Sequence, residues 1–150
     1  MASAEEIPGA VLFACTQNAI RSPMAAALMR HFYGNRVFVA SVGVRSGEVD
    51  PFVSVVMDEI GIDMTRHKPQ SFEDLEDANF DLVVSLSPEA HHRALEMTRT
   101  MAIQAEYWPT QDPSAVSGSR EQMLASYREV RDVLMGRIRK RFGTRGAPGV

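Results

Sequence analysis

Short runs of consecutive apolar residues alternate along the chain with longer segments of helical periodicity. Four of the apolar runs read AVLFAC, RVFVASV, FDLVVSL and IQAEYW, and they occupy residues 10–15, 36–42, 80–86 and 103–108. Runs of this length, rich in β-branched and aromatic residues, are typical of strands buried on both faces of a parallel sheet. The pattern therefore predicts four strands.

Four other segments carry apolar residues at helical spacing, and we expect each to be a helix whose apolar stripe faces the core. Gly34 and Gly61 follow the first two stripes, where glycine is expected to end a helix. The stripes comprise Met24, Ala27, Leu28, His31 and Phe32; then Phe52, Val56 and Ile60; then the segment 88–101; and finally Met123, Tyr127, Val130, Leu134 and Ile138.

The alternation of strands and helices predicts right-handed βαβ crossovers. The expected fold is α/β: one doubly wound, four-stranded parallel sheet with helices on both faces. We expect a single domain at residues 9–142, with flexible tails at 1–8 and 143–150. Ligands of such sheets bind beyond the carboxyl ends of the strands. Cys15, the last residue of the first apolar run, is expected at that edge.

The composition is that of an ordinary globular chain, with 150 residues, 45% hydrophobic content and a formal net charge of −3. The negative charge disfavours a nucleic-acid partner, and the basic cluster at 137–141 fits a solvated helix end. Neither a secretory signal nor an apolar stretch of membrane-spanning length is visible, so we expect no membrane partner. Because the single cysteine excludes an internal disulfide, a cytoplasmic location is expected.

The first apolar run leads into CTQNAIRSP, in which Cys15 and Arg21 are separated by five residues. Ser22 and Pro23 suit the N-cap and first position of a helix. A loop curled between a strand and a helix can direct its N–H groups at one anion, and an arginine fork can hold two phosphate oxygens. The same field favours a thiolate at Cys15. The predicted phosphate-binding set is Thr16, Gln17, Asn18, Ala19, Ile20, Arg21 and Ser22.

Expulsion of an alkoxide or phenoxide by a thiolate requires a proton donor on the far side of phosphorus. Asp112 precedes Pro113 in the loop after the fourth apolar run, on the same sheet edge as Cys15. An Asp-Pro pair is also an ordinary turn former. We predict that Asp112 protonates the leaving oxygen and later activates water against a phosphocysteine.

The chain resembles the low-molecular-weight protein tyrosine phosphatases from about residue 11 to residue 142, on the motifs CTQNAIRSP, ASVGV, GIDMTRHKPQSFEDL and the Asp-Pro pair. The resemblance implies a cofactor-free hydrolase of phosphotyrosine or aryl phosphate monoesters, acting on phosphorylated proteins or small aryl phosphates. Phosphate, sulfate or arsenate would bind in the loop. By resemblance Cys15 is the nucleophile, Arg21 the phosphate clamp, Ser22 the hydroxyl that steadies the thiolate and Asp112 the general acid. Asn18 would hold the loop in a left-handed conformation with help from Ser41.

The chain departs from the family pattern at several positions. Gln17 stands where glycine is usual, and Ile20 where a second cysteine is common. Ser114 and Ala115 replace the tyrosines that follow Asp-Pro in animal members. Tyr107 and Trp108 are the aromatic residues that could wall the substrate slot, or else they pack at the strand end.

Two alternatives remain beside a phosphatase. Thioredoxin-coupled arsenate reductases share the fold and loop, but they use further cysteines after the third strand, where this chain has Ser85 and Ser87. A reductase that uses an external thiol is therefore the second hypothesis. The third is a module that binds phosphate without turnover, although binding alone needs neither Cys15 nor Asp112.

The four histidines do not have the spacing of metal ligands, so we expect no metal site. We expect His31 to pack on its helix and His67 to belong to a basic loop. The adjacent His91 and His92 are expected on different faces of one helix.

Overall fold

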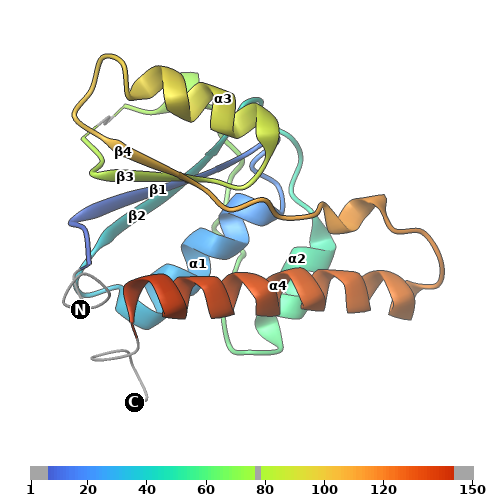
Figure 1. Ribbon diagram of the computed structural model, residues 1–150. Helices are drawn as coiled ribbons and strands as arrows, with labels where there is room; N and C mark the ends of the chain where they lie inside the picture. The colour runs from blue at the N-terminus through green and yellow to red at the C-terminus, as the bar shows by residue number, and fades with distance from the viewer. Residues whose placement is uncertain (1–6, 77–78, 144–150) are drawn as a thin grey trace.

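The computed structural model describes residues 7–76 and 79–143. Its centre is a four-stranded parallel sheet in the order β2-β1-β3-β4, with helices on both faces (Figure 1). The expected doubly wound α/β fold is therefore confirmed. The strands are β1 Ala10–Cys15, β2 Phe38–Gly43, β3 Leu82–Ser85 and β4 Gln104–Tyr107. The helices are α1 Arg21–Tyr33, α2 Pro51–Asp58, α3 Pro88–Met97 and α4 Arg120–Phe142, with 3-10 turns η2 Phe72–Asp74 and η3 Pro113–Ala115.

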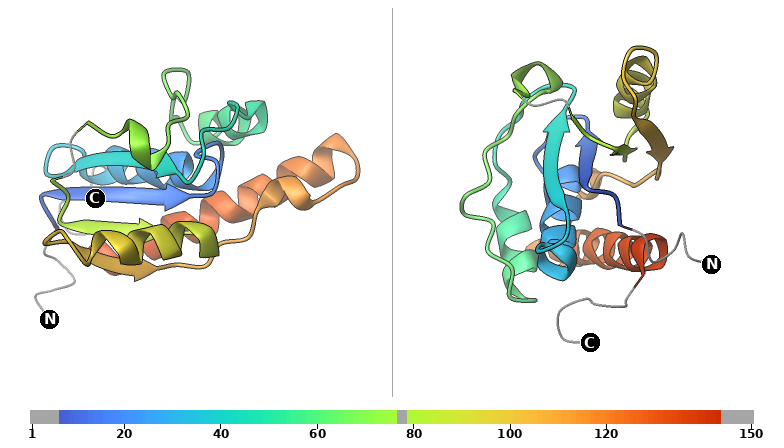
Figure 2. Two further views of the ribbon diagram at one scale, coloured as in Figure 1. Left: turned by 90° about the horizontal axis from the view of Figure 1, so that it is seen from above. Right: turned by 90° about the vertical axis from the view of Figure 1, so that its left-hand side faces the viewer.

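Successive residues of β1 point to opposite faces of the sheet and so belong to two cores. Val11 and Phe13 pack with α1, α2 and α4, whereas Leu12 and Ala14 pack with α3. Figure 1 shows α3 above the sheet and the other three helices below it. In Figure 2 the first half of α4 and η3 lie beyond the carboxyl ends of the strands, which is the edge where β1 ends. Helices packed against both faces thus hold β1 in place, and Cys15, its last residue, lies at that edge.

Local capping explains where three of the helices begin. Asp50 and Ser87 accept hydrogen bonds from backbone N–H groups at the starts of α2 and α3, and each is followed by proline. Ser119 caps α4 in a capping box with Gln122. These three starts follow directly from the sequence.

Helix α1 begins differently. Its N-cap is Ile20, which makes no side-chain capping bond, and Ser22 lies inside the first turn. The predicted N-cap role of Ser22 is therefore wrong, because its hydroxyl bonds with Cys15 and with the carbonyl of Val42 instead. The predicted stripe is also incomplete: α1 is buried on all sides over residues 22–29, whereas His31 is exposed.

Strand β4 was expected to be buried on both faces, and this is wrong. It lies at the edge of the sheet, where Gln104 is exposed and Tyr107 is 36% exposed. An apolar run does not reveal whether a strand has one neighbour or two. Helix α3 ends at Met97, four residues before the end of its predicted segment.

Most of the two predicted tails lies outside the described residues, in 1–6 and 144–150. Ile7, assigned to the first tail, packs partly buried against the core. Gly143 follows α4 with a φ of 86°, a conformation that favours glycine. Within the described residues, no helix combines the length and apolar character needed to cross a bilayer.

Candidate active site

The loop between β1 and α1 turns its carbonyl groups outward. The carbonyl oxygens of residues 15–17 accept hydrogen bonds from the backbone N–H groups of Val44, Arg45 and Gly47 at 3.0, 2.9 and 2.8 Å. The described residues contain no cis peptide bond, and the N–H and C=O of a trans peptide point in opposite directions. The N–H groups of residues 16–18 therefore face the inside of the loop, as an anion nest requires.

Asn18 holds the middle of this loop. It has a φ of 56°, the left-handed conformation expected there, and its side chain is fully buried. Its Nδ2 donates to the hydroxyl oxygens of Ser22 and Ser41, each at 2.9 Å, and its Oδ1 accepts from the N–H of Gln70 at 2.9 Å. The Asn18 carbonyl lies 2.8 Å from Nε2 of His67. Every polar group of this side chain thus has a partner, which offsets the cost of its backbone conformation.

The end of β2 approaches the loop so closely that only glycine fits. A Cβ atom on Gly43 would lie 2.6 Å from the Asn18 nitrogen and 2.5 Å from the Arg45 carbonyl oxygen. Both are backbone atoms, so a larger residue would displace the loop itself. Gly43 is consequently part of what sets the loop's shape.

Cys15 lies at the base of the loop, with only 2% of its surface exposed. Its Sγ is 2.9 Å from Oγ of Ser22 and 3.4 Å from the Ser22 nitrogen, which donates to it. Asn18 donates to Ser22 Oγ, so the single hydroxyl proton of Ser22 can go either to Sγ or to the Val42 carbonyl at 3.1 Å. A negatively charged sulfur would be the stronger acceptor of the two.

Arg21 joins the loop to the segment after β4. Its side chain is half-buried, and Nη1 donates to the Thr110 carbonyl at 3.0 Å. Asp112, two residues further along, is exposed and caps η3, with Oδ1 accepting from the N–H and the hydroxyl of Ser114 at 2.9 and 2.7 Å. Both contacts fall on one carboxylate oxygen of Asp112.

A pocket of about 170 Å³ brings these residues together from two distant parts of the chain. Cys15 and Arg21 line it from the loop, and Asp112 and Ser114 line it from the segment after β4. Thr16, Gln17, Ala19 and Ile20 complete the lining. Asn18 and Ser22, also named in the predicted phosphate-binding set, lie buried behind the pocket and support the loop.

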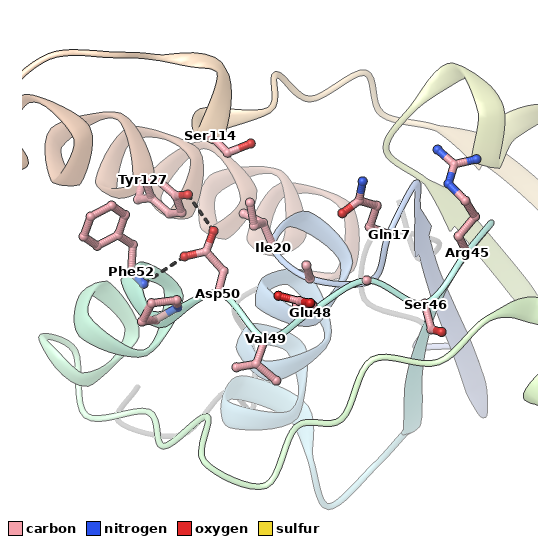
Figure 3. Close-up of a pocket in the computed structure, with 13 residues that line it drawn as sticks. Gln17, Ile20, Arg45, Ser46, Glu48, Val49, Asp50, Phe52, Ser114 and Tyr127 are labelled. Atoms are coloured by element: carbon pink, nitrogen blue, oxygen red, sulfur yellow. Dashed lines mark hydrogen bonds between the residues drawn. The ribbon is translucent and has the colours of Figure 1, made fainter.

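A larger pocket of about 580 Å³ adjoins the first and shares Gln17, Ala19, Ile20 and Ser114 with it. Its aromatic residues are Phe52 and Tyr127, whose rings pack edge to face (Figure 3). The Tyr127 hydroxyl donates to Oδ2 of Asp50 at 2.7 Å. Burial, followed by the nearby Asp50 carboxylate, raises the pKa of Tyr127, which therefore remains a hydrogen-bond donor.

Tyr107 and Trp108, the two residues considered as a replacement wall, line neither pocket. Tyr107 stacks on His91 with ring centroids 4.5 Å apart, and Trp108 packs against Phe13 and Phe142. Tyr107 and Trp108 therefore pack at the end of β4 and do not wall the substrate pocket. Tyr127 belongs to the core, as its stripe predicts, but it also lines the larger pocket, which the stripe could not show.

The segment after β3 also contacts the loop. Thr16 Oγ1 donates to Ser87 Oγ at 3.0 Å, so Ser87 lies beside the residue that follows Cys15. Ser85 lies 3.2 Å from Nδ1 of His91. His92, on another face of α3, pairs with Glu96 on the surface.

Sequence reasoning missed three supports of this site. His67 and Gln70 contact Asn18 from about 50 residues away, and Thr110 binds the Arg21 side chain from 89 residues away. The segment GIDMTRHKPQ, noted for its resemblance, was the one available signal for the first two. Within the described part of the chain, no group of three or more His, Cys, Asp or Glu residues could hold a metal ion.

Comparison with known proteins identifies the family of this chain. The model of the low molecular weight phosphotyrosine protein phosphatase family matches residues 10–144. The chain is 29% identical over 130 residues to an arsenate reductase of Bacillus subtilis, covering 87% of this chain and 92% of that protein.

Solved structures of this family have the same fold as this chain. A low molecular weight protein tyrosine phosphatase from T. tengcongensis superimposes with a TM-score of 0.70 at 26% identity, covering 87% of this chain and 95% of that one. An arsenate reductase in a phosphate-binding state has a TM-score of 0.67 at 27% identity, covering 86% and 92%. The chain therefore belongs to the low molecular weight phosphotyrosine protein phosphatase family.

Proposed function

We propose that this protein hydrolyses phosphotyrosine or aryl phosphate monoesters through a phosphocysteine on Cys15, with Asp112 as general acid and base. The observation that carries the proposal is the 170 Å³ pocket in which Cys15, Arg21 and Asp112 meet. In this proposal a phosphoryl group bound in the pocket would be attacked by Cys15, and Asp112 would donate a proton to the leaving oxygen. A module that only binds phosphate needs neither residue. Residues 9–142 would form this catalytic domain.

In the first step the phosphoryl oxygens accept hydrogen bonds from the inward-facing N–H groups of the loop and from the guanidinium of Arg21. The Cys15 thiolate attacks phosphorus, and the bond from phosphorus to the leaving oxygen breaks. Asp112 gives its proton to that oxygen, so the alcohol leaves neutral. The Ser22 hydroxyl and N–H, at 2.9 and 3.4 Å from Sγ, stabilise the thiolate before attack.

In the second step water attacks the phosphocysteine. The Asp112 carboxylate takes a proton from this water, the bond between phosphorus and Sγ breaks, and the electron pair returns to sulfur. Ser114 holds Oδ1 of Asp112 through two hydrogen bonds, so Oδ2 is the oxygen proposed to exchange the proton. The cycle ends with inorganic phosphate in the loop and needs no cofactor.

Arsenate reduction is the second candidate, because curated relatives such as the Bacillus subtilis protein carry that name. Here the Cys15 thiolate would attack arsenic, and one As–O bond of arsenate would break with the oxygen leaving as water. An external thiol would then attack Sγ, and the electron pair of the As–S bond would pass to arsenic, releasing arsenite and leaving a mixed disulfide. A second external thiol would restore Cys15. The position beside the loop holds a hydroxyl, that of Ser87, so the chain supplies no second thiol of its own.

A side-by-side assay separates the candidates. The purified protein is given para-nitrophenyl phosphate, a phosphotyrosine peptide, or arsenate with a panel of small thiols. We expect metal-independent release of phosphate from both esters and no arsenate-dependent oxidation of thiol. Thiol oxidation without ester hydrolysis would identify a reductase, and inactivity in all three assays would leave a phosphate-binding module.

A further inference from the structure

A third pocket, of about 320 Å³, lies behind the catalytic loop and shares no lining residue with the two pockets of the active site. Buried apolar side chains of α1, β2 and the segment after α2 contribute to it, among them Ala27, Val39 and Met64. Its volume is in the range of small-molecule sites.

Cations dominate its charged lining. Arg30, Arg66 and Lys68 border the pocket together with His67, and Asp63 is its one carboxylate. This excess of positive charge departs from the negative net charge of the whole chain. A concave surface lined by charge of one sign concentrates ions of the opposite sign.

Among these cations, Arg30 is held against the pocket wall by a hydrogen bond. Its Nη2 donates to the Val39 carbonyl at 3.2 Å, and within the described residues no carboxylate pairs with it. Partial burial lowers the pKa of Arg30, which reflects the cost of removing a guanidinium from water. Asp63 already accepts from the N–H of Thr65 and interacts with Arg66. An anion in the pocket would supply the counter-charge that Arg30 lacks among the described residues.

We infer that this pocket binds a small phosphorylated molecule that carries at least two negative charges. Its charged groups lie against Arg30, Arg66 and Lys68, and its uncharged part rests on the apolar floor. A single halide would leave most of the volume unfilled.

The pocket is connected to the catalytic loop through Asn18. Three partners of Asn18, namely Ser41, His67 and Gln70, line the pocket. A ligand that orders these residues alters the surroundings of Asn18, and by linkage an anion in the loop alters the affinity of the pocket. Anion binding in the catalytic loop would thus depend on the concentration of a phosphorylated metabolite that occupies this pocket.

Binding of inorganic pyrophosphate, measured by calorimetry at about physiological salt, tests the inference. Arg21→Ala is the starting protein, because it weakens anion binding in the catalytic loop. We expect one remaining site. Adding Arg66→Ser and Lys68→Ser should weaken that site by at least about tenfold. The matched control adds Arg99→Ser and Lys140→Ser, two exposed cations outside the pocket, and should weaken it by less than about twofold.

Loss of all pyrophosphate binding in Arg21→Ala would overturn the inference, as would an equal effect of the two double substitutions. In the Arg21→Ala protein, pyrophosphate should also shift the amide resonances of Gln70 and His67, which line this pocket. These readouts measure binding alone, so they do not depend on the proposed phosphatase activity.

Discussion

The Sγ atom of Cys15 lies 2.9 Å from the hydroxyl oxygen of Ser22, whose nitrogen also donates to that sulfur at 3.4 Å. Asn18 donates to the same hydroxyl oxygen, which directs the hydroxyl proton away from Asn18. The Ser22 hydroxyl therefore contacts the sulfur of Cys15 and does not cap helix α1. This relationship makes the serine a positioning and charge-stabilising residue in the proposed mechanism.

Ser22→Ala should lower kcat for aryl phosphates by about 10- to 100-fold, because a hydrogen bond to a charged group contributes about 1.5–3 kcal/mol. The rate of Cys15 alkylation by iodoacetate at neutral pH should fall in parallel, since the sulfur loses a hydrogen-bond donor that stabilises its charged form. Ser119→Ala, which removes an exposed capping serine remote from the pocket, is the matched control. An unchanged alkylation rate in Ser22→Ala would show that the Ser22 hydroxyl does not stabilise the charged form of the Cys15 sulfur.

Asp112→Ala should impair esters of poor leaving groups most, since they depend most on protonation of the departing oxygen. A series of aryl phosphates of graded leaving-group acidity should give a much steeper dependence of kcat/KM in the variant than in the unmodified protein. Ser114→Ala keeps the carboxyl group but removes the 2.7 Å hydroxyl contact, so it should cost less than about tenfold. A loss in Asp112→Ala that is uniform across the series would make this residue a turn former only.

Peroxide should inactivate the protein by oxidising Cys15, and no other cysteine in the chain can trap the sulfenic acid. Bound phosphate should slow the loss by covering the sulfur in its pocket. Mass spectrometry after graded peroxide should find sulfinic or sulfonic acid at Cys15, beyond rescue by thiols. A reduced Cys15 after the exposed Met101 has been oxidised would contradict a thiolate at this position.

Acidification should destabilise the fold through His67. Burial, more than any other cause, lowers the pKa of this imidazole below its usual 6.5, although the Asn18 carbonyl opposes the shift. As the pH falls through about 6.5 the unfolded chain gains a proton that the folded protein resists, so the free energy of unfolding decreases. Above this pH His67 is neutral in both states, and the stability that the folded protein gains from a neutral His67 is fully present. Denaturant midpoints at about pH 7.5 and about pH 5.5 should differ less in His67→Gln than in the unmodified chain; equal differences would refute the assignment.

Sequence patterns sufficed to place Cys15, Arg21 and Asp112 at one site because the carboxyl ends of parallel strands share an edge. The local capping preference wrongly predicted Ser22 as an N-cap, because its acceptor, the Val42 carbonyl, lies 20 residues away; the contact with Cys15 was indicated only by the family resemblance. The partners of Asn18 in the 67–70 segment are set by how the chain returns to the loop. The apolar run at β4 likewise could not show that this strand lies at the edge of the sheet.

Detection of a phosphorylated Cys15 during turnover tests the central claim most directly. The protein is mixed with para-nitrophenyl phosphate, quenched under alkaline denaturing conditions and digested for mass spectrometry. We expect phosphate on the peptide that contains Cys15, more of it in Asp112→Ala because water attack is slowed, and neither turnover nor a phosphocysteine in Cys15→Ser. Turnover without phosphate on Cys15, or full activity of Cys15→Ser, would contradict the account.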